Sequence, residues 1–144
     1  MQNNVDCETL LRSLVFMADG VAATIGDMGA RATMRLAGHR AAASLLEALP
    51  LRLEPDEAIR RAGPVMAELG FLDRIERLDA ANLVVHGSVI IRLLRSLQRE
   101  PQTHAACYYT IGLFEGFVNV MSHERVSVVR HEIRGETEKW TIET

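Results

Sequence analysis

The sequence has few of the residues that hold small folds together covalently or through metals. It contains two cysteines, Cys7 and Cys107, which lie about a hundred residues apart and form no CxxC pair. Such a wide spacing argues against a disulfide framework. A structural zinc ion usually needs four cysteine or histidine ligands, and this chain supplies them poorly. We therefore expect neither a disulfide nor a structural zinc.

Signals for secretion or for a membrane are also missing. Residues 1–10 lack a basic stretch before an apolar run, and no apolar run approaches the roughly 18 residues of a membrane span. We therefore expect a cytoplasmic protein without a membrane span. The net charge of −3 gives no positive field for nucleic acid, so no nucleic-acid partner is expected. Arg92, Arg95 and Arg99 share one helical face, which we interpret as solvated surface.

Motifs of the common enzyme classes are absent as well. The sequence has no GxSxG elbow, no HExxH, no phosphate-binding glycine loop and no pair of carboxylates spaced for acid–base chemistry. These absences favour a binding protein over an enzyme. No cofactor can be assigned from the sequence.

What the sequence does contain is enough apolar material for one compact domain. Hydrophobic residues make up 48% of the 144 residues, and aromatic residues only 5%. A chain of this length buries about two thirds of the surface that its unfolded form exposes. No repeat, linker or low-complexity tract divides the chain, so we predict a single helix-rich domain, residues 1–144.

Hydrophobic periodicity divides the chain into helices and two hairpins. The segment 88–98 is ambiguous, because its first half favours a strand and its second half a helical turn. Pro50 should end the second helix, and Gly135 should lie at the turn of the closing hairpin. The predicted helices are residues 6–25, 30–49, 54–70 and 103–123, and the predicted strands are 72–78, 83–87, 126–133 and 139–142.

We expect the rest of the chain to be organised around the helix predicted at residues 103–123. Its few polar residues form one narrow stripe and apolar residues cover the remainder, so the helix should be buried. We expect Thr103 to cap it and Glu115, on the polar stripe, to be solvated or at an interface. Gly112 and Gly116 are costly in a helix interior and are typical of places where a neighbouring backbone or a ligand comes close.

Three stretches, residues 29–42, 104–121 and 126–143, together with the order of the elements, resemble the 4-vinyl reductase-type (hydrocarbon-binding) small-molecule-binding domain family. The resemblance implies an α+β fold related to nitric-oxide-signalling and vesicle-tethering domains, with helices packed on an antiparallel sheet built from two hairpins. It also implies a dimer and a binding role, since relatives serve as sensors of small aromatic molecules or as accessory proteins of bacteriochlorophyll synthesis. Many members hold zinc through cysteines in the closing hairpin, which this chain lacks.

We expect a ligand pocket between the long helix and the sheet. An imidazole and two phenols at the start of the helix would be its polar handles, and the helix dipole there would lower the pKa of the neighbouring thiol. Aromatic side chains would form its walls, although plain core packing explains them equally well. Metal or haem ligation by His104 with Cys107 is a further alternative. The candidate ligand-binding residues are His104, Cys107, Tyr108, Phe117, Trp140 and His86.

These features lead to three hypotheses about function. The first is non-catalytic binding of a small hydrophobic or aromatic ligand by a sensor or carrier module. The alternatives are an accessory or reductase component of (bacterio)chlorophyll tetrapyrrole synthesis and a dimeric scaffold without a ligand. We expect a homodimer, which the alanine-rich second helix favours, with a small hydrophobic molecule and a partner protein as the other binding partners. His39 on that helix is expected to be packed or to face the dimer partner.

Overall fold

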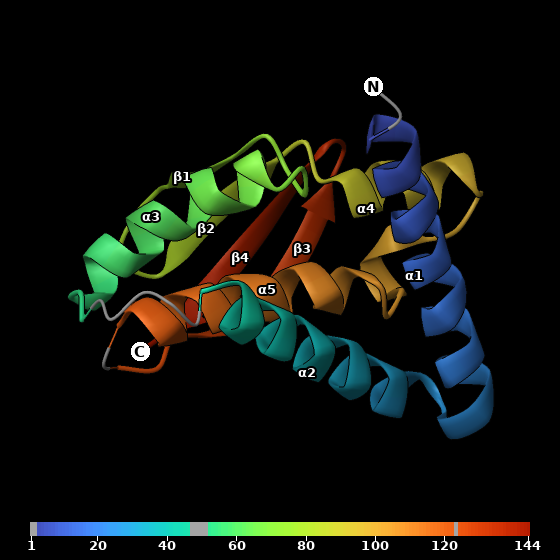
Figure 1. The fold of residues 1–144 in the computed structure, drawn as a ribbon, viewed down its shortest axis with the longest axis horizontal. Coiled ribbons are helices and arrows are strands. Elements are labelled where there is room, and N and C mark those ends of the chain that lie inside the picture. The colour runs from blue at the N-terminus through green and yellow to red at the C-terminus, as the bar shows by residue number, and fades with distance from the viewer. Residues whose placement is uncertain (1–2, 47–51, 123) are drawn as a thin grey trace.

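The structure is a computed structural model that describes residues 3–46, 52–122 and 124–144, with side chains from residue 8 onward. The predicted helix ends at Pro50 and His123, and the thiol of Cys7, lie outside this described part. The predicted α+β class is confirmed: within the described chain, five α-helices accompany one four-stranded antiparallel sheet (Figure 1).

The helices and strands follow the predicted order, with β1 shorter and β4 longer than the sequence predicts. In chain order they are α1 (Asn3–Ile25), α2 (Asp27–Leu45), α3 (Pro55–Glu68), β1 (Arg74–Arg77), β2 (Asn82–His86), α4 (Val89–Ser96), the 3₁₀ turn η1 (Pro101–Thr103), α5 (Cys107–Met121), β3 (Ser127–Arg134) and β4 (Thr137–Glu143). The ambiguous segment is the helix α4. Ser88 caps it by accepting a hydrogen bond from the Ile91 N–H at 3.4 Å, and its apolar residues are buried on one side.

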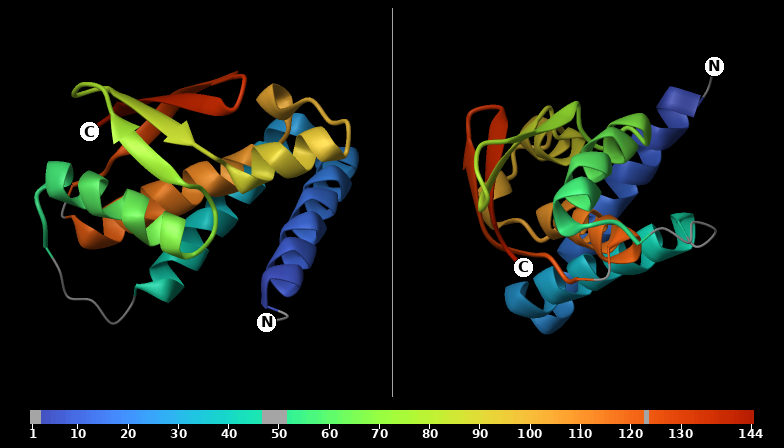
Figure 2. Two further views of the ribbon diagram at one scale, coloured as in Figure 1. Left: turned by 90° about the horizontal axis from the view of Figure 1, so that it is seen from above. Right: turned by 90° about the vertical axis from the view of Figure 1, so that its left-hand side faces the viewer.

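The sheet joins the two predicted hairpins in the order β1-β2-β4-β3. Trp140 on β4 lies opposite Leu83 on β2 and opposite His131 on β3, and all neighbouring strands are antiparallel. Gly135 has a φ of +59° in the turn between β3 and β4, a conformation that glycine adopts without strain. The helices lie on one side of the sheet, so Trp140 and Ile142 on that side are buried (Figure 2).

Helix α5 begins later than the sequence predicts. Thr103 belongs to η1, His104 is extended, and the helix starts at Cys107. The ring Nδ1 of His104 accepts a hydrogen bond from the Ala106 N–H at 3.0 Å, which holds the turn that precedes the helix. Thr103 therefore does not cap the helix, and His104 is not part of its first turn.

Helices α2 and α5 touch through their backbones, and three glycines make this possible. A Cβ atom added at Gly112 would lie 2.1 Å from the carbonyl oxygen of Arg35, and one at Gly38 would lie 2.4 Å from that of Tyr109. A Cβ at Gly116 would lie 2.6 Å from the Cβ of Ala42. Of the two alternatives for Gly112 and Gly116, the structure therefore shows a neighbouring backbone, and these glycines open no space for a ligand.

A membrane-spanning role is not supported by the described helices. None of them combines the length and the apolar composition that crossing a bilayer requires.

Candidate functional site

The six candidate ligand-binding residues lie in separate surroundings. His104, Cys107 and Tyr108 are close in sequence at the start of α5, whereas Phe117 lies further along the same helix. Trp140 faces α5 from the sheet. On β2 the buried residues are Leu83 and Val85, so the alternation of the strand turns His86 to the opposite face. The structure thus does not bring His86 to the side of the sheet that α5 covers.

His104 ties α1 to the loop before α5. Its Nε2 lies 2.7 Å from Oδ1 of Asp19, and Arg99 donates to the other oxygen of Asp19 at 2.5 Å. Burial alone would raise the pKa of Asp19, but the hydrogen bonds from Arg99 and His104 outweigh it and hold the pKa below its ordinary value. Both ring nitrogens of His104 have protein partners, so this residue already has a structural task.

Cys107 and Tyr108 are held by protein contacts as well. The thiol of Cys107 donates to the carbonyl oxygen of Pro101 at 3.3 Å. Burial, and then the charge of Glu138, raise the pKa of Cys107 well above its ordinary value, so the expected lowering by the helix dipole is wrong. The ring of Tyr108 stands edge-on to His131 at 5.1 Å between centroids, with the Arg31 guanidinium over its face.

Phe117 and Trp140 are part of a packed layer between α5 and the sheet. Both are 0% exposed, and Trp140 lies against Phe114 with ring centroids 5.1 Å apart. Two buried polar atoms, Nε1 of Trp140 and Oγ1 of Thr110, have no hydrogen-bond partner among the described residues. In this layer aromatic side chains fill the space in which the sequence predicts a pocket.

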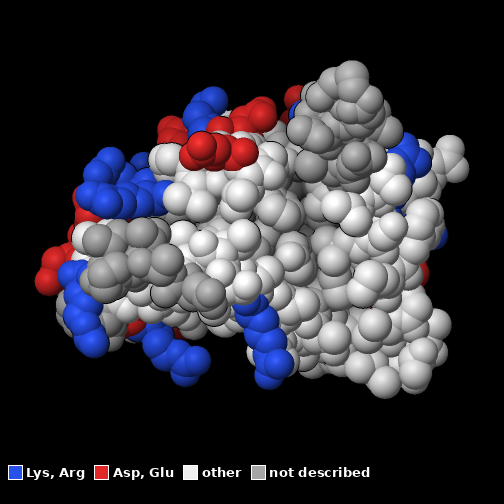
Figure 3. Space-filling model, in the orientation of Figure 1, with Lys and Arg blue, Asp and Glu red and all other residues white. Residues whose placement is uncertain are grey.

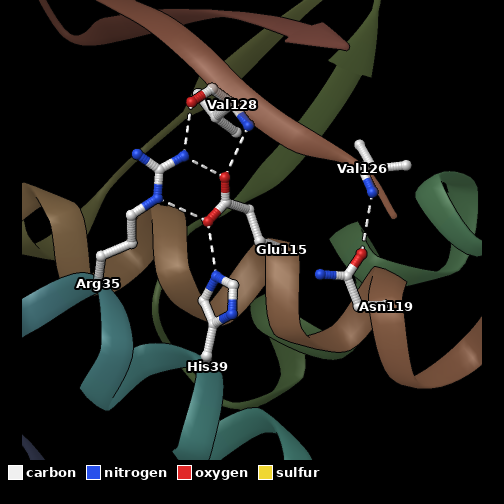
Figure 4. A network of polar contacts seen from close by, with 6 residues as sticks. All are labelled: Arg35, His39, Glu115, Asn119, Val126 and Val128. Carbon is white, nitrogen blue, oxygen red and sulfur yellow. Dashed lines mark hydrogen bonds and ion pairs between the residues drawn. The ribbon is translucent and has the colours of Figure 1, made fainter. Parts of the chain in front are cut away.

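A polar network that the sequence analysis missed lies where α2, α5 and β3 meet (Figure 4). The side chain of Glu115 is only 2% exposed, which overturns its expected position in solvent or at an interface. Arg35 donates to both of its oxygens, His39 Nε2 lies 2.7 Å from Oε1, and the Val128 N–H donates to Oε2 at 2.7 Å. Arg35 also donates to the Val128 carbonyl oxygen at 2.6 Å, so one guanidinium joins α5 to β3.

The charges of this network favour an ionised Glu115. Burial alone would raise the pKa of Glu115, but hydrogen bonds from Arg35, His39 and the Val128 N–H outweigh burial and lower it. A signal for the network exists in the sequence: a glutamate in the middle of an apolar helix needs a partner, and Arg35 and His39 lie four residues apart on one helical face. His39 is packed, one of its two expected positions, and its partner is Glu115.

Of the surface hollows on the described chain, one lies between α3 and the turn that joins β1 to β2. It has a volume of about 670 Å³, and charged residues line much of it. Arg77 pairs with Asp56 at 3.0 Å, and Arg60 pairs with Glu57. Because these ions are paired, and the remaining carboxylate of the lining, Asp79, accepts hydrogen bonds from the Ala81 N–H and the Asn82 side chain, this hollow offers little to a charged ligand.

A second hollow, which we call the apolar groove, lies between α1 and the region where α3 ends and α4 begins. It has a volume of about 560 Å³. Its apolar lining is Leu10, Leu11, Leu69, Phe71 and Val89, with Glu8, Glu68 and Arg92 among the other lining residues. The floor is supported from α5, because Phe71 packs on Tyr109 with ring centroids 6.0 Å apart.

A third hollow, the arginine hollow, lies between the start of α4 and the ends of β1, β2 and β4. It has a volume of about 480 Å³, and its lining includes Arg74, Arg92, Arg95, His86 and Ser88. None of the three arginines forms an ion pair with any carboxylate among the described side chains. Arg92 lines this hollow and the apolar groove.

Metal ligation finds no support in the described chain, where no three His, Cys, Asp or Glu side chains come together as they would around an ion. No model of a known protein family matches the sequence, and no curated protein is similar enough to match it. The candidate site is therefore defined by the geometry of the chain alone. The candidate site that we take forward is the apolar groove with the arginine hollow beside it.

Proposed function

We propose that the protein binds a small, largely apolar molecule in the apolar groove, as a sensor or carrier module. The observation that carries the proposal is a hollow of about 560 Å³ whose lining is dominated by leucine, valine and phenylalanine side chains. Small-molecule sites usually have volumes of about 300–1,000 Å³ and apolar walls with a few polar groups. The resemblance to hydrocarbon-binding domains supports a binding role of this kind, at a different place on the fold.

The exposure of the lining supports the same proposal. Leu10 is 69% exposed and Leu69 is 42% exposed, so both are large apolar side chains that the packed core leaves in water. An apolar ligand that covers exposed leucines lining one groove removes them from water, which stabilises the complex by about 25 cal/mol per Å² of apolar surface buried.

The test is binding of the neutral fluorescent probe Nile red to the purified full-length chain. The wild type should bind the probe with a blue-shifted emission. Leu69→Glu places a charge in the groove and should weaken binding by about tenfold or more. Leu78→Glu is the matched control, because Leu78 is a similarly exposed leucine that lines the hollow at the β1–β2 turn. Circular dichroism should show both variants folded.

Two outcomes would contradict the proposal. If the wild type does not bind the probe, the proposed ligand site is refuted. Loss of binding in Leu78→Glu with full binding in Leu69→Glu would move the site to the other hollow.

A second proposal, homodimer formation, rests on a different observation. Leu10, Leu14, Met17 and Val21 form an apolar stripe along α1 at the three- and four-residue steps typical of helix pairing, and Met28 is a further apolar residue at the start of α2. Met17 is 61% exposed and Met28 is 80% exposed. Over α1 and the first half of α2, the face shown in Figure 3 carries almost no charged side chains. A second copy of this chain is the occupant that we propose for this face.

Sedimentation at micromolar concentration tests the dimer. The wild type should sediment at about twice the chain mass of 16.0 kDa. Met17→Arg should give the single-chain mass, whereas Val129→Arg, at a comparably exposed position on β3, should leave the dimer intact. A wild type that sediments as a single chain would refute this proposal without touching the first.

A further inference from the structure

The apolar groove and the arginine hollow adjoin each other at the start of α4. Val89 lines the groove, its neighbour Ser88 lines the hollow, and Arg92, one helical turn further on, lines both. An arginine in this position can lay its aliphatic stem along apolar surface and keep its guanidinium in a polar setting. A single ligand with an apolar part and a charged end would therefore fit both hollows at once.

The charges of the arginine hollow indicate which charged end it would accept. Arg74, Arg92 and Arg95 are three cations around it, and Asp73 and Glu136 are two anions. With His86 counted as neutral, the lining has a formal charge of one positive. No carboxylate among the described side chains pairs with the three arginines. Arg74 Nη2 lies 3.5 Å from Nε2 of His86, whereas the guanidinium groups of Arg92 and Arg95 form no hydrogen bond within the described part of the chain, so most of the N–H donors remain free for an anion. A monoanion would neutralise the hollow, and a guanidinium binds a carboxylate through two parallel hydrogen bonds.

We infer that the ligand is a long-chain carboxylate, with its chain in the apolar groove and its carboxylate among Arg74, Arg92 and Arg95. This inference rests on the proposed function, because it uses the same groove, and it adds the chemical class of the ligand. The two hollows contribute differently. The groove provides affinity for any apolar chain, and the arginines provide the preference for an anionic end.

Competition against bound Nile red tests the inference with three ligands on the full chain. Decanoate and 1-decanol share one chain and differ in the charge of the head group, whereas acetate has the head group without the chain. In the wild type, decanoate should displace the probe at a roughly fivefold lower concentration than decanol, because an exposed ion pair contributes modestly. Acetate at the same concentrations should displace nothing. The preference for decanoate should shrink in 0.5 M NaCl, which screens exposed charges.

A double variant identifies the residues responsible. In Arg74→Gln/Arg95→Gln, whose two arginines line the arginine hollow and not the apolar groove, the displacement by decanoate should weaken toward that of decanol, while decanol itself is unchanged. Arg130→Gln is the matched control, since Arg130 is an exposed arginine on β3 that lines neither hollow.

The outcomes separate this inference from the proposed function. Equal displacement by decanoate and decanol in the wild type would overturn the carboxylate and leave the apolar site standing. A preference lost equally in Arg130→Gln would also overturn it, because net charge and not the hollow would then be the cause. Displacement by acetate alone would show a simple anion site and would refute the two-part ligand. If the wild type does not bind Nile red, both proposals fail together.

Discussion

Replacing Gly112 by alanine is the sharpest test of how α2 and α5 pack. At this position a Cβ atom would lie 2.1 Å from the carbonyl oxygen of Arg35 and 2.9 Å from its carbonyl carbon. Both are backbone atoms inside a helix, so no side-chain rotation can relieve the contact. The two helices would have to move apart by about an ångström or more to reach ordinary van der Waals distance.

The expected loss of stability follows from two opposing effects. Alanine in place of glycine favours a helix by about 0.8–1 kcal/mol. Overpacking a close interface costs about 1–3 kcal/mol, and here it also displaces Arg35, which holds Glu115. Glu115 would then lose part of its hydrogen bonding while still buried, which costs about 1–3 kcal/mol more. We therefore expect Gly112→Ala to lower the free energy of unfolding by about 2–4 kcal/mol.

Urea unfolding followed by circular dichroism at one fixed protein concentration measures this change. Gly20→Ala is the matched control, because Gly20 lies inside α1 and a Cβ there would meet no atom within 4 Å. That variant should be more stable than the wild type by about 0.5–1 kcal/mol. If Gly112→Ala also gains stability, the close backbone contact between α2 and α5 is refuted, and this contact would not require glycine at position 112.

Three further predictions concern buried polar groups. Glu115→Gln should lower the free energy of unfolding by about 2–4 kcal/mol at pH 7 in urea unfolding, because it weakens the network with Arg35. The pKa of Glu115 is lowered in the folded state, so its contribution to the free energy of unfolding is present above the unfolded pKa and is lost as the pH falls through the folded pKa. If Glu115→Gln loses stability at acidic pH in the same way as the wild type, this reasoning is contradicted. Thr110→Val should raise the free energy of unfolding by about 1 kcal/mol, seen as a higher thermal midpoint, since the hydroxyl is buried without a partner among the described residues. Ser88→Ala should lower the free energy of unfolding by about 1 kcal/mol, because it removes the cap of α4. An unchanged melting temperature in either variant would contradict the prediction for that residue.

The order of elements was predictable because it depends on local signals. Apolar periodicity marks the helices, Gly26 separates α1 from α2, Gly70 follows the end of α3, and a glycine turn marks the closing hairpin. The start of α5 was not predictable in this way. It depends on a hydrogen bond from a backbone N–H to the ring of His104, and a histidine is not a usual capping residue.

The candidate site depends on long-range contacts, which the sequence analysis could not place. Alternation along β2 is a local property, yet which face α5 would cover could not be read from it, so the sequence left open whether His86 faces the pocket or solvent. The apolar groove is formed by Leu10 and Leu69, which are far apart in the chain and carry no motif. The arginines of α4 were visible as a helical face, but only the strands beside them turn that face into a hollow.

Helix α1 takes part in both proposals, and this overlap bears on whether the protein would be a sensor or a carrier. Leu10 lines the apolar groove and also begins the stripe that we propose pairs with a second copy. The helix packs mainly on α2 and only slightly on α4, so a ligand in the groove would add contacts that fix its position. If pairing with a second copy also favours one position of α1, the ligand changes dimer affinity by the same factor by which the dimer changes ligand affinity. A sensor needs such coupling and a carrier does not, and the shared position of Leu10 therefore favours the sensor.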